Sequence, residues 1–120
     1  MKVHFYSFTD GKKSISYETD LTLLDKGYRF KDHSIENTSL EFHIIDQNHV
    51  QMYRNGAVNS KMDFIIGKST KSSYFSDSLS FEFDVLTHAI TVKNNALSIE
   101  YDYYYQGDKI GKIKVGLLIK

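Results

Sequence analysis

Hydrophobic and polar residues alternate along most of this chain with a period of two, which is typical of half-buried β-strands. The alternation is clear between Met52 and Phe64, where Arg54 and Ser60 stand in phase with apolar neighbours. Both side chains are therefore expected to point toward the core, as Met52 and Phe64 do. A guanidinium group in a core is costly, so Arg54 needs a physical explanation.

The same pattern predicts about ten strands and no helix. Runs rich in Tyr, Phe, Ile, Val and Thr are separated by Gly, Asn, Asp and Ser, and the chain contains no proline. The runs are 3–9, 13–24, 28–33, 38–45, 49–54, 58–67, 69–76, 79–87, 89–93, 96–105 and 110–119. In an alternative reading, 58–67 and 69–76 form one strand that bends at Gly67.

Short turns between the runs predict an antiparallel meander, and turn length fixes which residues face each other. We predict a two-residue turn at 94–95 and three-residue turns at 46–48, 55–57 and 107–109, with Asn48 in the left-handed conformation. The expected pairs are Val92–Leu97, Ile90–Ile99, His88–Tyr101, Ile44–Val50, Phe42–Met52, Arg54–Val58, Met52–Ser60, Tyr103–Ile113, Tyr101–Val115 and Ile99–Leu117. Such a meander closes most easily into an all-β, up-and-down antiparallel barrel, because closure removes the unpaired edges. A Greek-key sandwich is the alternative.

Length and composition fit one domain spanning residues 1–120. Charged residues make up 25% of the chain and the formal net charge is zero, so we expect neither nucleic acid nor a membrane surface as a partner. The absence of cysteine excludes disulfides, thiol nucleophiles and thiolate metal sites. The first residues lack the apolar run of a secretory signal, and we expect a cytoplasmic protein.

The order Arg54-x-Gly56, then Ser60-Lys61-Met62-x-Phe64, then a Ser/Thr-rich strand ending at Tyr74 resembles the YwiB-like family. The resemblance extends over nearly the whole chain. It implies a small bacterial β-barrel of the lipocalin-like, calycin type, and it implies no activity because the function of that family is unknown. The chain departs from the family after Tyr74, where Ser76-Asp77-Ser78-Leu79 stands in place of a Thr-Pro-Tyr-Gly-like turn.

The inward phase offers no acidic partner to Arg54, since the strand carboxylates fall on the opposite phase. Three interpretations follow. Arg54 reaches water at the barrel rim, or backbone carbonyls and the hydroxyls of Tyr17, Ser60, Thr70 or Tyr74 hold it inside. In the third, its planar fork of donors receives a carboxylate or phosphate ligand.

Other candidate chemistry is sparse. Tyr101, Tyr103 and Tyr105 share one face, a stripe more typical of core packing than of a ligand cage, although it could line a cavity. The five histidines show no three-ligand metal spacing, and no nucleophile elbow or phosphate-binding loop is present. Outward carboxylates are interpreted as a solvated surface facing lysines rather than as an acid–base pair; they are Glu82, Asp84, Glu100 and Asp102, with Lys112 and Lys114 opposite.

These observations favour a non-enzymatic barrel that binds a small, largely apolar molecule, either uncharged or anionic, at its mouth. The residues assigned to this site are Arg54, Ser60, Tyr74, Tyr101 and Tyr103, with no catalytic residue, metal or cofactor. The alternative is a structural or interaction protein whose interior is filled by side chains and whose outer apolar strips form a homodimer. An enzyme with an unrecognised site is the weakest of the three hypotheses.

Overall fold

Ten antiparallel strands close into a single barrel in a computed structural model that describes residues 1–120. The strands are β1 (Lys2–Thr9), β2 (Lys12–Leu24), β3 (Gly27–Lys31), β4 (Thr38–Asp46), β5 (His49–Gly56), β6 (Val58–Ile65), β7 (Ser69–Ser76), β8 (Ser80–Lys93), β9 (Ala96–Tyr105) and β10 (Asp108–Ile119). Each strand pairs with its neighbours along the chain, and β1 pairs with β10, so no edge is left open. The predicted all-β, up-and-down barrel is confirmed.

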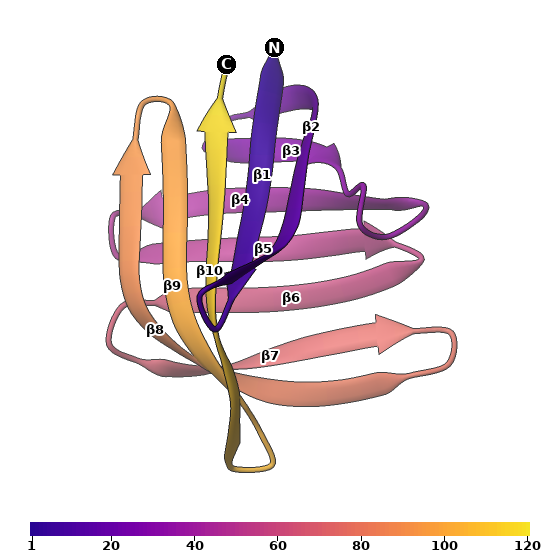
Figure 1. Cartoon of the computed structure of the whole chain (residues 1–120), viewed down its shortest axis with the longest axis vertical. Coiled ribbons are helices and arrows are strands. Elements are labelled where there is room, and N and C mark those ends of the chain that lie inside the picture. Colours follow the sequence, from indigo (N-terminus) through magenta and orange to yellow (C-terminus); the bar gives the residue numbers. More distant parts are fainter.

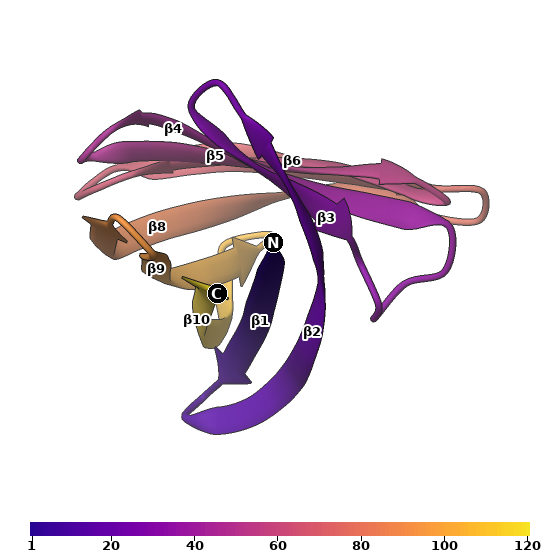
Figure 2. The same ribbon diagram turned by 90° about the horizontal axis from the view of Figure 1, so that it is seen from above.

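The barrel is flattened into two layers whose strands run crosswise (Figure 1). One layer contains β4 to β7, and the other contains β1, β9 and β10, as the view from above also shows (Figure 2). The long strand β8 joins the layers, because it pairs with β7 along its first half and with β9 along its second. The chain ends meet where the Lys120 amide donates to the Lys2 carbonyl at 2.9 Å.

The hydrophobic core lies between the two layers. Alternate residues of every strand point into it, which is why the period-two pattern in the sequence is so regular. The buried members are Val3, Phe5, Phe30, Leu40, Phe42, Val50, Met52, Met62, Phe64, Val85, Leu97, Ile99, Tyr101, Val115 and Leu117. Phe5, Phe30 and Phe42 contact one another at ring-centroid distances of 5.7 to 6.3 Å.

In one place the division into strands differs from the prediction. The runs 79–87 and 89–93 form one strand, β8, interrupted by a β-bulge between Thr87 and Ala89. The runs 58–67 and 69–76 are the separate strands β6 and β7, as predicted, and the bent-strand alternative is wrong. Gly67 lies in the turn between them with φ of 77°, a conformation that glycine adopts freely.

The predicted pairs Ile44–Val50, Phe42–Met52, Val92–Leu97 and Ile90–Ile99 are confirmed. The two other hairpins are shifted by two residues. Arg54 faces Ser60 and Met52 faces Met62, whereas Tyr101, Ile99 and Leu97 face Ile113, Val115 and Leu117. Because the shift is even, every side chain stays on its predicted face. The bulge at His88 displaces that residue, so Tyr101 faces Thr87.

Local turn geometry explains these shifts. The β9–β10 turn consists of Gln106 and Gly107, with φ of 52° and 87°, and a bulge at Ile110 absorbs the extra residue. In the β4–β5 hairpin, a bulge at Ile45 absorbs the extra residue. The prediction that Asn48 adopts the left-handed conformation is wrong. The β5–β6 loop is longer than predicted because Gly56 remains paired with Thr38 of β4.

Candidate functional site at the barrel mouth

The inner face of the barrel changes from buried to exposed toward one end. Along β9, Ile99 is 0% exposed, Tyr101 is 6% exposed and Tyr105 is 38% exposed, although all three share the inward phase. On β8, Val85 is fully buried, whereas Phe83 and Phe81 are half-buried. The interior is therefore packed in its middle and accessible at this end, which we call the mouth.

Aromatic rings line the mouth from β7 to β9. Tyr74 stacks on Phe81 with 5.1 Å between ring centroids, and Phe81 meets the edge of Tyr105 at 5.7 Å. Phe83 and Tyr103 form a further edge-to-face pair at 5.9 Å. An open groove of about 360 Å³ runs over this surface, lined by Leu79, Ser80, Phe81, Tyr103, Tyr105 and Ile110. Such rings offer a flat apolar surface with phenol hydroxyls at its edge.

Arg54 lies at the same mouth and is bound to a buried carboxylate. Its Nε donates to Oδ2 of Asp32 at 3.2 Å; the Asp32 side chain is 0% exposed and that of Arg54 is 18% exposed. The other Asp32 oxygen, Oδ1, accepts from the Tyr17 hydroxyl at 3.2 Å. It also accepts from the Ser34 amide at 2.9 Å and the Ser34 hydroxyl at 2.5 Å. The buried charge of Asp32 is thus fully compensated by hydrogen bonds.

The expectation that Arg54 lacks an internal counter-ion is wrong. Asp32 follows the last residue of β3 and continues the alternation of Tyr28 and Phe30, so its inward direction could be read from the sequence. Of the hydroxyls proposed to hold Arg54, only that of Tyr17 belongs to the network, and it binds Asp32 instead. Burial, followed by the nearby charge of Asp32, raises the pKa of Tyr17 well above its usual value of 10.0.

Three residues at the mouth carry donor groups that have no protein acceptor. Arg54 makes its one side-chain hydrogen bond through Nε, which leaves both terminal Nη groups unbonded. The hydroxyls of Ser60 and Ser72 are also unpartnered, although these residues are only 7% and 3% exposed. Ser60 faces Arg54 across β5 and β6, and Ser72 lies on β7 two residues before Tyr74, the β7 partner of Ser60. The mouth therefore combines an apolar wall with a floor of hydrogen-bond donors.

The five residues predicted for the site divide into two groups. Arg54, Tyr74 and Tyr103 are partly exposed at the mouth, and the buried Ser60 lies between Arg54 and Tyr74 in the strand register. Tyr101 instead lies deeper, where its ring meets that of Phe64 at 4.8 Å and burial raises its pKa. Asp32, Phe81 and Ser72 belong to the mouth but were absent from the sequence-based assignment.

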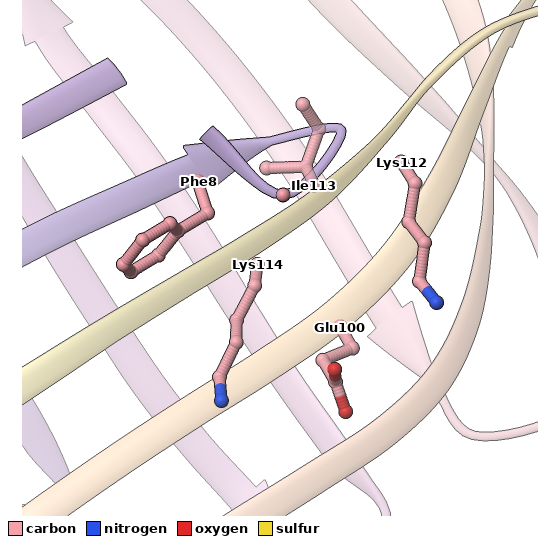
Figure 3. Close-up of a pocket in the computed structure, with 6 residues that line it drawn as sticks. Phe8, Glu100, Lys112, Ile113 and Lys114 are labelled. Carbon is pink, nitrogen blue, oxygen red and sulfur yellow. The ribbon is translucent and has the colours of Figure 1, made fainter. Parts of the chain in front are cut away.

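The outer face holds a shallow polar depression of about 370 Å³, shown in Figure 3. Glu100, Lys112 and Lys114 project side by side over it, while Ile113 points to the opposite side (Figure 3). Lys114 faces Glu100 in the β9–β10 pairing, as the predicted solvated face of carboxylates and lysines requires.

Asp102 departs from that prediction because its side chain is only 9% exposed. His88 binds Asp102 Oδ2 at 2.8 Å, and the Lys109 ammonium lies 3.4 Å from the same atom. Burial opposes ionisation, but the hydrogen bond and charge of His88, with the charge of Lys109, outweigh it, so the pKa of Asp102 lies below its usual value. This cluster ties the β8 bulge to β9 and β10.

The structure contains no group of three or more acidic or histidine side chains placed to hold a metal ion. It also contains no helix with the length and hydrophobicity of a membrane span.

Comparisons with known proteins bear on this barrel directly. The family model described as a domain of unknown function, DUF1934, matches residues 6–117. The chain belongs to this family. Its structure matches the crystal structure of the ywiB protein from Bacillus subtilis with a TM-score of 0.64 and 15% identity, covering 99% of this chain and 89% of that one. No curated protein sequence matches the chain.

At this level of identity the structural match establishes the fold of this DUF1934 domain. The resemblance inferred from the motif around Arg54 is confirmed. The β7–β8 turn, where the sequence departs from the family pattern, is closed by the Ser76 amide donating to the Leu79 carbonyl at 2.7 Å. Leu79 also lines the groove, so the departure falls within the mouth.

Proposed function

We propose that this protein is a non-enzymatic binding barrel that takes a small, largely apolar molecule into its mouth. The observation that carries the proposal is the exposed inner face of β7, β8 and β9. Inward aromatic residues normally become buried when a barrel closes, yet Phe81, Phe83 and Tyr103 are only partly buried. A bound apolar molecule would complete their burial, and each ring would gain hydrophobic contact.

The size of the mouth supports a small ligand. The groove of about 360 Å³ lies at the lower end of the roughly 300 to 1,000 Å³ typical of ligand sites. The buried core beneath it, from Val85 to Ile99, is filled by side chains. The ligand would therefore lie on the aromatic wall at the mouth rather than deep in the barrel.

The arrangement of charges supports binding rather than catalysis. Asp32, the one carboxylate at the mouth, accepts hydrogen bonds from Tyr17, Ser34 and Arg54. A carboxylate whose two oxygens are both held by protein donors is poorly placed to contact a substrate as a general base. The Ser60 hydroxyl has no hydrogen-bond partner, so no histidine or carboxylate is in place to activate it as a nucleophile.

The uncharged dye N-phenylnaphthylamine, which fluoresces strongly in apolar surroundings, provides the test. The wild-type protein should enhance its fluorescence in a saturable way, and Phe81→Ala should weaken binding about tenfold or more. Phe75→Ala is the matched control, since Phe75 lies in the same β7–β8 hairpin but points outward and is 57% exposed. Equal loss in both variants, or no saturable binding by the wild type, would contradict the proposal.

A second proposed function is homodimerisation, favoured by an exposed apolar patch at one end of the barrel. Leu23 and Ile45 are 56% and 51% exposed. They line a common depression with Leu24 at the end of the barrel away from Arg54. Light scattering at high protein concentration tests this function: a dimer that Ile45→Lys dissociates supports it, and a monomer at all concentrations excludes it.

A further inference from the structure

We infer that the polar end of the ligand is an uncharged hydrogen-bond acceptor, such as the carbonyl oxygen of a ketone, ester or amide, rather than a carboxylate or phosphate. This inference rests on the proposed function and names the chemical class that the mouth selects. It depends on two features of the mouth: which donors lack an acceptor, and how much charge is left uncompensated.

The residues that carry the unbonded donors are close neighbours in the strand register. Arg54 faces Ser60 directly in the β5–β6 register, and Ser60 faces Tyr74 in the β6–β7 register. Ser72 lies two residues before Tyr74, the β7 partner of Ser60, so the Ser72 hydroxyl is a diagonal neighbour of Ser60. Both hydroxyls are more than nine-tenths buried without a partner, a costly state that an incoming oxygen atom would relieve.

The net charge of the mouth is zero. Arg54 and Asp32 are the charged residues among the buried and half-buried positions of the inner face, and they already form an ion pair. A carboxylate placed beside Arg54 would bring a second negative charge toward the fully buried Asp32, without a second cation to balance it. Desolvating that charge is unfavourable, whereas a carbonyl oxygen can accept the same hydrogen bonds without this penalty.

The distances along the sheet allow one molecule to use both the floor and the wall. Arg54, Ser60, Tyr74 and Phe81 are successive partners across β5, β6, β7 and β8. Neighbouring strands are about 4.8 Å apart, so Ser60 and Phe81 are separated by roughly 10 Å. A ligand with two fused rings on Phe81 and Tyr74 would place an attached carbonyl group near Ser60.

Three probes with the same two fused rings separate this inference from the proposed function. Naphthalene has no acceptor, methyl naphthyl ketone adds an uncharged carbonyl, and naphthoate replaces it with a carboxylate; each is measured by displacement of the bound dye at neutral pH. The ketone should bind about tenfold more tightly than either of the other two. Naphthoate as the tightest probe would overturn the inference but leave the binding function standing, whereas no binding by any probe would remove both.

Two sets of variants test the stated cause. Asp32→Asn leaves the charge of Arg54 uncompensated, so the preference should move toward naphthoate; an unchanged preference would contradict the charge argument. Ser72→Ala should weaken binding of the ketone severalfold without affecting naphthalene, and its matched control is Ser73→Ala, at the next, outward position of β7. Ser72→Ala breaks no protein hydrogen bond, because the Ser72 hydroxyl has no partner. This variant should therefore fold even if Asp32→Asn does not. Equal effects of the two serine variants would overturn the assignment of the floor.

Discussion

Arg54 at the end of β5 donates from Nε to Asp32, which follows β3, at 3.2 Å. The ion pair spans the intervening strand β4 and joins two segments 22 residues apart in the chain. The Asp32 side chain is fully buried, and three further hydrogen bonds from Tyr17 and Ser34 complete its surroundings. This pair fixes the conformation of the β3–β4 loop and directs Arg54 toward the mouth.

Removal of Arg54 should therefore destabilise the fold strongly. Arg54→Met leaves the Asp32 carboxylate buried without its cation, and the free energy of unfolding should fall by about 3 kcal/mol. The double variant Asp32→Asn/Arg54→Met should regain much of this loss, because no uncompensated charge remains. Urea denaturation followed by circular dichroism measures both.

Arg29→Met is the control for that experiment. Arg29 lies half-exposed on the outer face, 4.0 Å from Glu41, where an ion pair contributes less than about 1 kcal/mol. A similar loss in Arg29→Met and Arg54→Met would show that burial of the Arg54–Asp32 pair has no special importance.

Stability should decline at alkaline pH through Tyr17. Its folded-state pKa is raised above 10.0, first by burial and then by Asp32, so the neutral phenol is preferred in the folded state. The resulting stability is complete below pH 10 and is lost as the pH rises from there toward the folded-state pKa. Tyr17→Phe should cost about 1 to 2 kcal/mol at neutral pH and should show a weaker alkaline decline. Parallel alkaline declines in the wild type and Tyr17→Phe would contradict this assignment.

Gly56 is required by the close approach of another strand. A Cβ atom at this position would lie 2.0 Å from the Asn37 carbonyl oxygen, and φ is 140°. Gly56→Ala should lower the free energy of unfolding by more than about 3 kcal/mol. Gly67→Ala is the control: φ is 77° and no atom would lie within 4 Å of its Cβ, so the loss should stay near 1 to 2 kcal/mol. Thermal unfolding of the two variants compares them, and equal losses would argue against the steric explanation.

Asp102 should contribute to stability at neutral pH and lose that contribution in acid. Its folded-state pKa is lowered because His88 and Lys109 outweigh the effect of burial. The contribution is present above the usual pKa of 3.8 and disappears as the pH falls through the folded-state value. Asp102→Asn should cost about 1 to 2 kcal/mol at neutral pH, and this difference should vanish in strong acid.

Asp84→Asn serves as the surface comparison for Asp102. Asp84 pairs with Lys71 at 3.3 Å, but both side chains are well exposed, so its loss should be below about 1 kcal/mol at neutral pH. Unfolding curves over a series of pH values distinguish the two. An Asp102→Asn variant as stable as the wild type at neutral pH would contradict a stabilising role for the cluster.

Side-chain phase made the fold readable from the sequence. Period-two alternation placed Phe42, Met52 and Ile99 inward, and even errors in turn length did not alter these faces. The pairing register was harder to predict from the sequence, because bulges at Ile45, His88 and Ile110 each insert one residue. A bulge depends on packing between strands, and these three positions carry no distinctive residue.

The candidate site was only partly readable. Arg54 was recognised as anomalous from its phase alone, and Asp32 could have been paired with it by extending the alternation of Tyr28 and Phe30. Exposure at the mouth could not be inferred, since Tyr101 and Tyr103 share a phase but differ in burial. Their difference arises from where the barrel opens, a property of the whole closed sheet.

The most direct test of the account is a nuclear magnetic resonance titration of isotopically labelled protein with methyl naphthyl ketone. The account predicts saturable shifts for Ser60, Ser72, Tyr74, Phe81 and Tyr103, and small shifts for outward residues of the same strands such as Lys61 and Phe75. Shifts that fall mainly on the outer face, or an absence of saturable shifts at the mouth, would contradict the claim that the mouth beside Arg54 is a ligand-binding site.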